Sequence, residues 1–282
     1  MERLANWWQD VFQSDASHEA WWERKKALCQ ERGVEISRIQ GDGHVFQELR
    51  YDRESIFHYL LHVSFLMKQK DYLYREEQVI PLQFRMLPDQ SIEHIKLESK
   101  PAESAESNSA ELLEARDAAE YRFTYDRLAA VKYAERWWND YNPAYQRFRV
   151  DCTNYISQCL YAGGAPMRGA PNRGTGWWYQ NNNWSYSWSV AHSFRWYLSG
   201  STKGLTGKEV GTAEELIPGD VICYDFEGDG RWDHSTIVVA KDAYGMPLVN
   251  AHTDNSRNRY WSYEDSTAYT PNMAYKFFHI GE

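Results

Sequence analysis

Two periodicities of apolar residues divide the first hundred residues of the chain. In residues 4–32, aromatic and aliphatic side chains recur at roughly helical spacing, with an interruption near Ser14. This pattern predicts helix, and Gly33 is a typical residue just after a helix C-terminus. The pattern then changes to one typical of strands, and Gly41-Asp42-Gly43 is expected to be a hairpin turn. We expect strands at 34–40, 44–50, 56–67, 72–86 and 92–97.

The composition changes sharply after this region. Residues 99–120 are rich in Ser, Ala and Glu, and residues 101–120 contain six acidic side chains against one basic side chain. Such a segment is typical of a linker, here ending in a short helix from Ala110. The predicted organisation is therefore a small helix-plus-meander α+β module at 1–98, an acidic linker at 99–120 and a second domain at 121–282.

The second domain is expected to be α+β, with helices before and between antiparallel strands. Leu128, Val131, Ala134 and Trp138 share one helical face, and a helix at 152–162 ends at a pair of glycines. An aromatic loop follows at 174–188, then a helical segment at 190–198. Strands are expected at 221–226, 235–240, 248–252 and 273–280.

Composition and charge narrow the classes of function. The 282 residues carry a formal net charge of −9, and 43% of them are hydrophobic. Binding to nucleic acid is therefore not expected, since phosphate contacts need clustered Lys and Arg. The four cysteines show neither a CxxC pair nor zinc-type Cys/His spacing. We expect no metal and no organic cofactor.

The N-terminal residues lack the basic head and apolar stretch of a secretory signal, and no apolar run reaches about 20 residues. We therefore expect a soluble, cytoplasmic protein with reduced thiols and no membrane span. An extracellular or cell-wall location stays open if a signal has been removed or export is non-classical. The oligomeric state is not predicted.

The run Asp-Cys-Thr-Asn-Tyr-Ile-Ser-Gln at 151–158 carries the strongest candidate chemistry. It places Cys152 in the first turn of a predicted helix, where backbone N–H groups and the helix dipole lower a thiol pKa. Asp151 is expected to cap this helix with its side chain. A buried structural cysteine is the alternative interpretation.

His234 is the natural base for this thiol, because it opens a predicted strand after a glycine-rich turn. A base also needs a third group that fixes its tautomer and orientation. His252 and Asn250 both qualify, and they share one face of a later strand because they are two residues apart. We favour His252 and keep Asn250 as the second choice.

The thiol run resembles the putative amidase domain family of Gram-positive bacteria, which belongs to the papain-like superfamily. The resemblance covers about residues 125–280. It implies a papain-like thiol hydrolase of amide bonds, with Cys152 as nucleophile, His234 as base and a peptide or peptidoglycan-type substrate. Gln146 lies six residues before Cys152, the offset at which papain-like peptidases place an oxyanion-hole glutamine; Asp151 is a further candidate for an orienting or oxyanion role. Other matching pieces are 133–138, 142–143, 219–224, 233–238 and 251–253.

The aromatic loop is a candidate recognition element. Trp177, Trp178 and Trp184 stand among asparagines and serines there, a composition suited to binding sugars or peptides. Packing of these rings into the core is the alternative. Asp225, Asp229 and Asp233, spaced by four, are expected to form a solvated turn rather than a calcium loop.

Two other functions remain open. The domain could be a catalytically degenerate module that binds glycan or peptide through the tryptophan-rich loop. A redox sensor using Cys152 and Cys159 is disfavoured, because seven residues along a helix separate them by about 10 Å, too far for a disulfide.

Overall fold

The computed structural model describes residues 2–14, 17, 19–51, 54–89, 91–96 and 123–281. The predicted linker at 99–120 lies outside these residues. The described α-helices are α1 (Glu2–Gln13), α2 (Ala20–Glu31), α3 (Arg127–Trp137), α4 (Cys152–Ala162), α5 (Tyr186–Ser189) and α6 (Ala191–Gly200). The described strands are β1 (Glu35–Arg50), β2 (Ser55–Gln69), β3 (Tyr72–Met86), β4 (Ile92–Lys96), β5 (Tyr179–Gln180), β6 (Asn183–Trp184), β7 (Gly207–Val210), β8 (Val221–Asp225), β9 (His234–Lys241), β10 (Pro247–Ala251), β11 (Ser256–Tyr260) and β12 (Ala274–Ile280).

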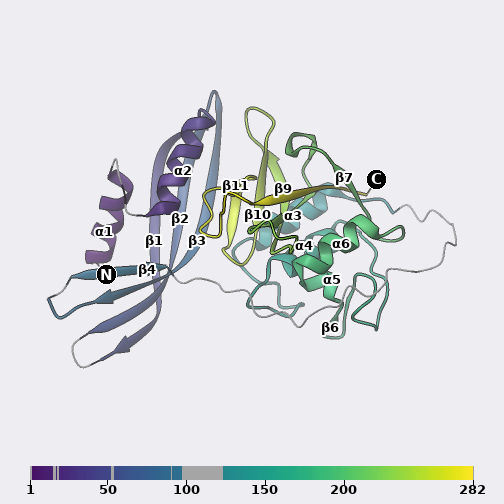
Figure 1. The fold of residues 1–282 in the computed structure, drawn as a ribbon, viewed down its shortest axis with the longest axis horizontal. Helices are drawn as coiled ribbons and strands as arrows, with labels where there is room; N and C mark the ends of the chain where they lie inside the picture. The colour runs from purple at the N-terminus through teal and green to yellow at the C-terminus, as the bar shows by residue number, and fades with distance from the viewer. Residues whose placement is uncertain are drawn as a thin grey trace.

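One antiparallel sheet of ten strands runs through both parts of the chain (Figure 1). Its order is β1-β2-β3-β11-β10-β9-β8-β12-β7, and β4 pairs with β3 beside this path. The α+β class is thus confirmed. The N-terminal and C-terminal strands meet where β3 pairs with β11 through Gln78–Ser256 and Glu77–Arg257. The boundaries predicted for the two domains stay a prediction.

The predicted hairpin at Gly41-Asp42-Gly43 is wrong, because β1 continues through it. Gly41 pairs with Val63 and Gly43 pairs with Leu61 inside the β1–β2 ladder. A Cβ built on Gly41 would lie 3.7 Å from the nearest atom of Leu61, so the glycine relieves no close contact with that neighbour. Glycine inside a strand often marks a place where something approaches the backbone closely, and here both glycines line a groove beneath α1.

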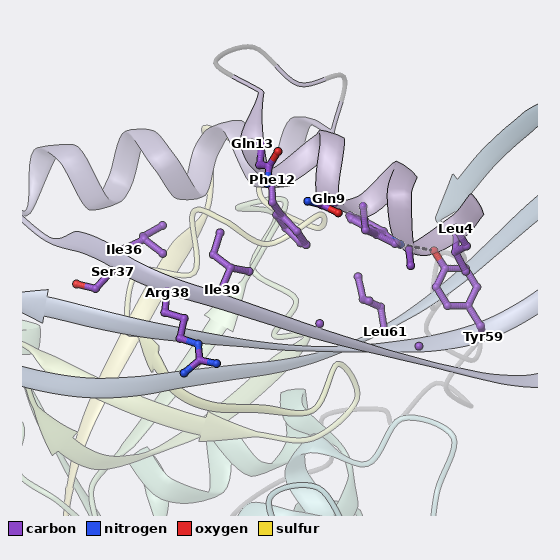
Figure 2. A pocket seen from close by; sticks show the side chains of 14 residues that line it. Leu4, Gln9, Phe12, Gln13, Ile36, Ser37, Arg38, Ile39, Tyr59 and Leu61 are labelled. Carbon is purple, nitrogen blue, oxygen red and sulfur yellow. Dashed lines mark hydrogen bonds between the residues drawn. The ribbon is translucent and has the colours of Figure 1, made fainter. Parts of the chain in front are cut away.

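Helices α1 and α2 cover one face of β1–β3, and the single predicted helix of residues 4–32 is two helices. Trp8 of α1 donates a hydrogen bond from Nε1 to the Tyr59 hydroxyl at 2.8 Å, and Trp22 of α2 stacks on Phe65 with ring centroids 5.8 Å apart. The groove left between α1 and the sheet has a volume of about 530 Å³ (Figure 2). Its walls are mainly apolar, and the Arg38 side chain points away from α1.

A buried ionic cluster joins α2 to the junction of the two parts. Lys25 of α2 lies 2.5 Å from Glu76 of β3 and 3.1 Å from Asp265, and Asp265 also accepts from Arg259 of β11 at 2.9 Å. Each of these side chains is almost fully buried. Removing one partner would leave an uncompensated buried charge, so the cluster fixes α2 against β3 and β11.

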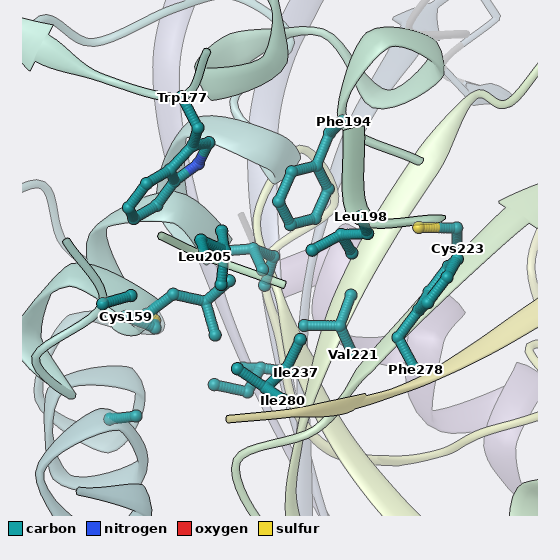
Figure 3. Close-up of a cluster of buried hydrophobic side chains, with 14 of the residues drawn as sticks. Cys159, Trp177, Phe194, Leu198, Leu205, Val221, Cys223, Ile237, Phe278 and Ile280 are labelled. Carbon is teal, nitrogen blue, oxygen red and sulfur yellow. The ribbon is translucent and has the colours of Figure 1, made fainter. Parts of the chain in front are cut away.

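The core of the C-terminal part lies between α4 and the sheet (Figure 3). Cys159 of α4 belongs to this core, together with Val221 and Cys223 of β8 and Ile237 of β9. The alternate residues of these strands face the other side, where Tyr224 and its neighbours form a separate cluster. This alternation decides on which face each candidate site residue of β9 lies.

The elements around the candidate site follow the prediction closely. Helix α4 begins at Cys152 and ends just before Gly163, and the strands β8, β9, β10 and β12 occupy the expected segments. Four strands of this part were not predicted. The strands β5 and β6 are two-residue strands inside the expected aromatic loop. The segments of β7 and β11, Gly-Lys-Glu-Val and Ser-Arg-Asn-Arg-Tyr, carry little of the apolar alternation that predicts a strand. Among the described residues, no helix is long and apolar enough to cross a membrane.

Candidate active site

Cys152 is the first residue of α4, and it is only 2% exposed. Its backbone N–H donates to Thr253 Oγ1 at 3.2 Å, and the N–H of Asp151 donates to the same oxygen at 3.1 Å. The Cys152 sulfur lies 3.8 Å from Thr153 Oγ1 and 4.0 Å from the carbonyl oxygen of Asp233. The thiol therefore sits between the start of α4, the start of β9 and the loop after β10.

Burial raises the pKa of the Cys152 thiol, and hydrogen bonds oppose this rise. The Thr153 side chain, the Ser235 backbone and the Thr253 side chain each lower that pKa. Burial is the largest of these causes. In this conformation the thiol is the stable form of Cys152.

The Asp151 side chain does not cap α4, contrary to the prediction. Its Oδ1 accepts from the Phe148 N–H at 2.9 Å and from Asn154 Nδ2 at 3.0 Å. Its Oδ2 lies 2.8 Å from His252 Nδ1. Asp151 thus holds the loop before α4 to the loop after β10, and the cap falls to another residue.

His252 has partners at both ring nitrogens. Nδ1 faces Asp151, and Nε2 lies 2.8 Å from the carbonyl oxygen of Trp137 at the end of α3. A carbonyl only accepts, so Nε2 donates to the Trp137 oxygen. The Tyr155 ring stacks on the imidazole with centroids 4.0 Å apart. His252 thus joins the end of α3 to Asp151, the residue before α4, through buried hydrogen bonds.

Asn250 is also engaged elsewhere. Its Nδ2 donates to Glu135 Oε1 at 2.9 Å, and its Oδ1 accepts from the Asn258 N–H at 2.9 Å. Neither His252 nor Asn250 is hydrogen-bonded to His234 in the described part of the chain. The predicted orienting contact is not formed by either residue.

His234 opens β9 as predicted, but its side chain lies on the face opposite α4. Ser235 reaches Thr153 of α4 with hydroxyl oxygens 3.4 Å apart, so its neighbour His234 points to the other side. There the imidazole packs among three aromatic rings, with centroid separations of 5.2 Å to Tyr263, 5.7 Å to Tyr224 and 6.0 Å to Phe226. No hydrogen bond joins His234 to Cys152 among the described contacts.

The electrostatics of His234 follow from this placement. The pKa of His234 is lowered to about 3, mainly by burial and in part by nearby Arg259, while Asp254 opposes this shift. The imidazole is therefore neutral near neutral pH, and its Nε2 is buried with no hydrogen-bond partner in the described ranges. A neutral imidazole with an unpartnered nitrogen can accept a proton, but here it lies across the sheet from the thiol.

Gln146 does not reach the thiol through the hydrogen bonds of the described residues. Its side chain is directed to its own neighbour, with Nε2 donating to the Arg147 carbonyl at 2.9 Å. Its backbone carbonyl accepts from Asn154 Nδ2 at 3.0 Å. The residue anchors the loop before α4, and the oxyanion role stays a prediction.

The tryptophan-rich loop is mainly core. Trp177 and Trp178 are 0% and 2% exposed, and Trp177 Nε1 donates to Ser157 Oγ on α4 at 2.9 Å. The prediction that these two rings form a substrate wall is wrong, because the loop folds over α4 and buries them. Trp184 is half-buried and packs edge-on against Phe148 with centroids 4.8 Å apart.

The acidic turn before β9 is compact. Carboxylate oxygens of Asp225, Glu227 and Asp233 come within 4.8 Å of one another. Asp225 already accepts hydrogen bonds from three consecutive backbone N–H groups, at residues 228–230. Burial and the neighbouring carboxylates raise the pKa of Asp233 to about 7. Backbone N–H groups of the turn already stabilise the Asp225 carboxylate, and we assign no metal to the turn.

Comparison with known proteins identifies the C-terminal part. Residues 124–278, more than half of the chain, match the family described as "putative amidase domain". The chain belongs to this family. It is 52% identical over 265 residues to the uncharacterized protein YhbB of Bacillus subtilis (strain 168), covering 92% of this chain and 85% of that protein.

A second relative is more distant. The uncharacterized protein YjcM of the same organism is 30% identical over 176 residues, which cover 59% of this chain and 40% of that protein. No solved structure matches the chain. The α+β architecture is therefore shown by the structure itself, and the papain-like assignment rests on the resemblance of its motifs.

The sequence analysis missed two features of the site: the Asp151–His252 pair and the role of Thr253. Acidic and imidazole side chains in separate motifs gave no indication that they would pair with each other. Thr253 adjoins His252 in a quoted motif, but a threonine carries no local signal for capping a helix a hundred residues earlier in the chain.

Proposed function

We propose that the chain is a cysteine-dependent hydrolase of amide bonds with Cys152 as its nucleophile. The observation that carries the proposal is the placement of this thiol, inside a matched amidase-family segment, at the start of α4 and among hydrogen-bond donors. Helix N-termini and such donors stabilise a thiolate and the oxyanion that forms beside it.

In this reaction the Cys152 proton passes to a base, and the sulfur attacks the amide carbonyl. The carbon–sulfur bond forms, the carbon–nitrogen bond breaks, and the amine leaves with a proton returned by the base. Water then cleaves the thioester, which releases the carboxylic acid and restores the thiol. The substrate we propose is an amide of a peptide or peptidoglycan fragment, the class implied by the family resemblance.

His234 is the base in this proposal. The residues on both sides of it touch the sulfur, since the Asp233 carbonyl lies 4.0 Å away and the Ser235 backbone hydrogen-bonds to it. The imidazole itself lies on the opposite face of β9, among aromatic rings. The proposal therefore requires the ring to leave its aromatic surroundings by rearrangement at the start of β9, where the preceding turn contains Gly228 and Gly230 at positive φ.

Amide hydrolysis by purified protein tests the function. The wild type, Cys152→Ala and the matched control Cys159→Ala are incubated under reducing conditions with peptide and peptidoglycan-fragment amides, and products are followed by mass spectrometry. Cys159 lies on the same helix and is fully buried. We expect wild type and Cys159→Ala to release products and Cys152→Ala to lose turnover by at least about 1,000-fold. Turnover retained by Cys152→Ala would overturn the assignment.

A binding module without turnover is the second candidate. It is favoured by the burial of Cys152 and by the separation of His234 from the thiol. In that case wild type and Cys152→Ala bind the same fragments with equal affinity, and neither releases a product.

A further inference from the structure

Thr253 has an unusual backbone conformation at the edge of the candidate site. It follows β10 directly after His252 and has a φ of +88°. A β-branched residue rarely adopts positive φ, and such conformations persist only where surrounding contacts hold them. Residues held in this way cluster at functional sites, so the contacts of Thr253 are of interest.

Those contacts are with the start of α4. Thr253 Oγ1 accepts the N–H of Asp151 at 3.1 Å and the N–H of Cys152 at 3.2 Å. The first N–H groups of a helix have no partner within the helix and are commonly satisfied by the preceding side chain. Here that side chain, Asp151, is bound to His252, and Thr253 supplies the cap from a different element.

The two accepted hydrogen bonds determine where the hydroxyl proton goes. A threonine hydroxyl has two acceptor sites and one donor. Since two N–H groups occupy the acceptor sites, the hydroxyl proton is free to donate, and hydrogen bonding by the Thr253 side chain is one of the causes that lower the pKa of Cys152. The same oxygen orients the backbone that carries the thiol.

We propose that Thr253 is a positioning residue for Cys152, which caps α4 from the loop after β10 and stabilises the thiolate through its hydroxyl. The proposal rests on Cys152 being the nucleophile. The hydrogen bond from Thr253 lowers the pKa of Cys152, against the larger effect of burial.

Several other groups also face the Cys152 thiol, and a test of Thr253 must be distinguished from their effects. Thr153 faces it from α4, and the Asp233–His234–Ser235 segment faces it from β9. Cys223 on β8 interacts with it electrostatically. The hydrogen-bonded pair of Asp151 and His252 lies at the helix start. Thr153 Oγ1 is 3.8 Å from the sulfur and its hydrogen bond also lowers the pKa of Cys152, but Thr153 makes no cap contact, so Thr153→Val removes a hydroxyl at the thiol and leaves the cap in place.

The experiment measures iodoacetamide labelling of Cys152 against pH in the full chain, by mass spectrometry, with the fully buried Cys159 as an internal reference for unfolding. The variants are Thr253→Val, Thr253→Ser, Thr253→Gly and Thr153→Val. Glycine relieves the positive φ while removing the hydroxyl, so it remains informative if valine unfolds the protein.

We expect Thr253→Val and Thr253→Gly to slow Cys152 labelling by about tenfold near neutral pH and to move its midpoint to higher pH. Thr253→Ser should restore most of the wild-type profile. Thr153→Val should also move the midpoint to higher pH, since its hydroxyl lies beside the sulfur. An unchanged profile in Thr253→Gly, or a serine variant as slow as the glycine one, would overturn the proposal.

Labelling needs no turnover, so the two proposals fail separately. If the wild type never hydrolyses an amide but the Thr253 variants shift labelling as expected, the hydrolase function falls and the role of Thr253 stands. If hydrolysis depends on Cys152 but labelling does not change in the Thr253 variants, the hydrolase function stands and the proposed role of Thr253 falls.

Discussion

The two faces of β9 provide opposite surroundings for the two candidate catalytic groups. On the α4 face, the Cys152 sulfur is surrounded by hydroxyl, N–H and carbonyl groups. On the other face, the His234 imidazole is enclosed by aromatic rings, and its Nε2 has no hydrogen-bond partner among the described residues. Within the described part of the chain, the thiol thus has polar neighbours but no hydrogen-bonded base.

This difference shows that two residues next to each other in a strand can have side chains in entirely different surroundings. Successive side chains of a strand point to opposite faces, so Ser235 meets α4 while His234 cannot. A one-residue slip at the start of β9 would exchange them. Whether the His234 imidazole can reach the Cys152 thiol therefore depends on a rearrangement at the start of β9.

The largest expected effect concerns the base. If His234 crosses to the thiol, His234→Gln should lower turnover by about 100- to 10,000-fold, because an amide cannot accept the proton. Turnover of wild type and variant on the same amide substrate measures this. Replacing the exposed His44 by Gln is the control. If His234→Gln is as active as the wild type, the two faces stay separate and another group is the base.

The next effect concerns the hydrogen bond between Asp151 and His252 on the thiol face. His252→Ala leaves the buried Asp151 Oδ2 without this donor, so we expect the free energy of unfolding to fall by about 3 kcal/mol. Urea denaturation followed by circular dichroism measures this. An unchanged denaturation midpoint, together with lost turnover, would return His252 to the orienting role predicted from sequence.

The smallest expected effect is a pH dependence of the free energy of unfolding, caused by the His234 imidazole on the aromatic face of β9. Burial lowers the pKa of His234 to about 3 in the folded state, while an unperturbed histidine titrates near about 6.5. Above that pH both states are neutral and stability does not depend on this group. As pH falls below it, only the unfolded state takes up the proton, so stability falls by about 1.4 kcal/mol per pH unit.

His234→Phe keeps a ring in the cluster and removes this titration. Comparison of the unfolding free energy of the wild type and His234→Phe between pH 7 and pH 5 gives the slope, since other groups titrate in both proteins. Parallel pH profiles would mean that the imidazole is exposed or paired in solution, which would break the contrast between the two faces.

Local sequence signals predicted most elements around the site. The glycines after α4, the short apolar runs in β8, β9 and β10, and the polar run at 151–158 each indicate their own element. The signal failed at Gly41 and Gly43, because glycines in a long strand resemble those of a hairpin turn. It also failed at Trp177 and Trp178, since a loop tryptophan has the same local sequence whether it is exposed or buried.

The sequence by itself determined the family, the α+β class and the position of Cys152 at the start of a helix, because these depend on short-range patterns and motif order. Only the tertiary structure decided the partners. Strand alternation placed the His234 side chain across the sheet, Asp151 paired with His252 from about a hundred residues away, and Thr253 took over the cap of α4. These outcomes depend on which face of a strand meets which helix, and that is fixed by the packing of the whole sheet.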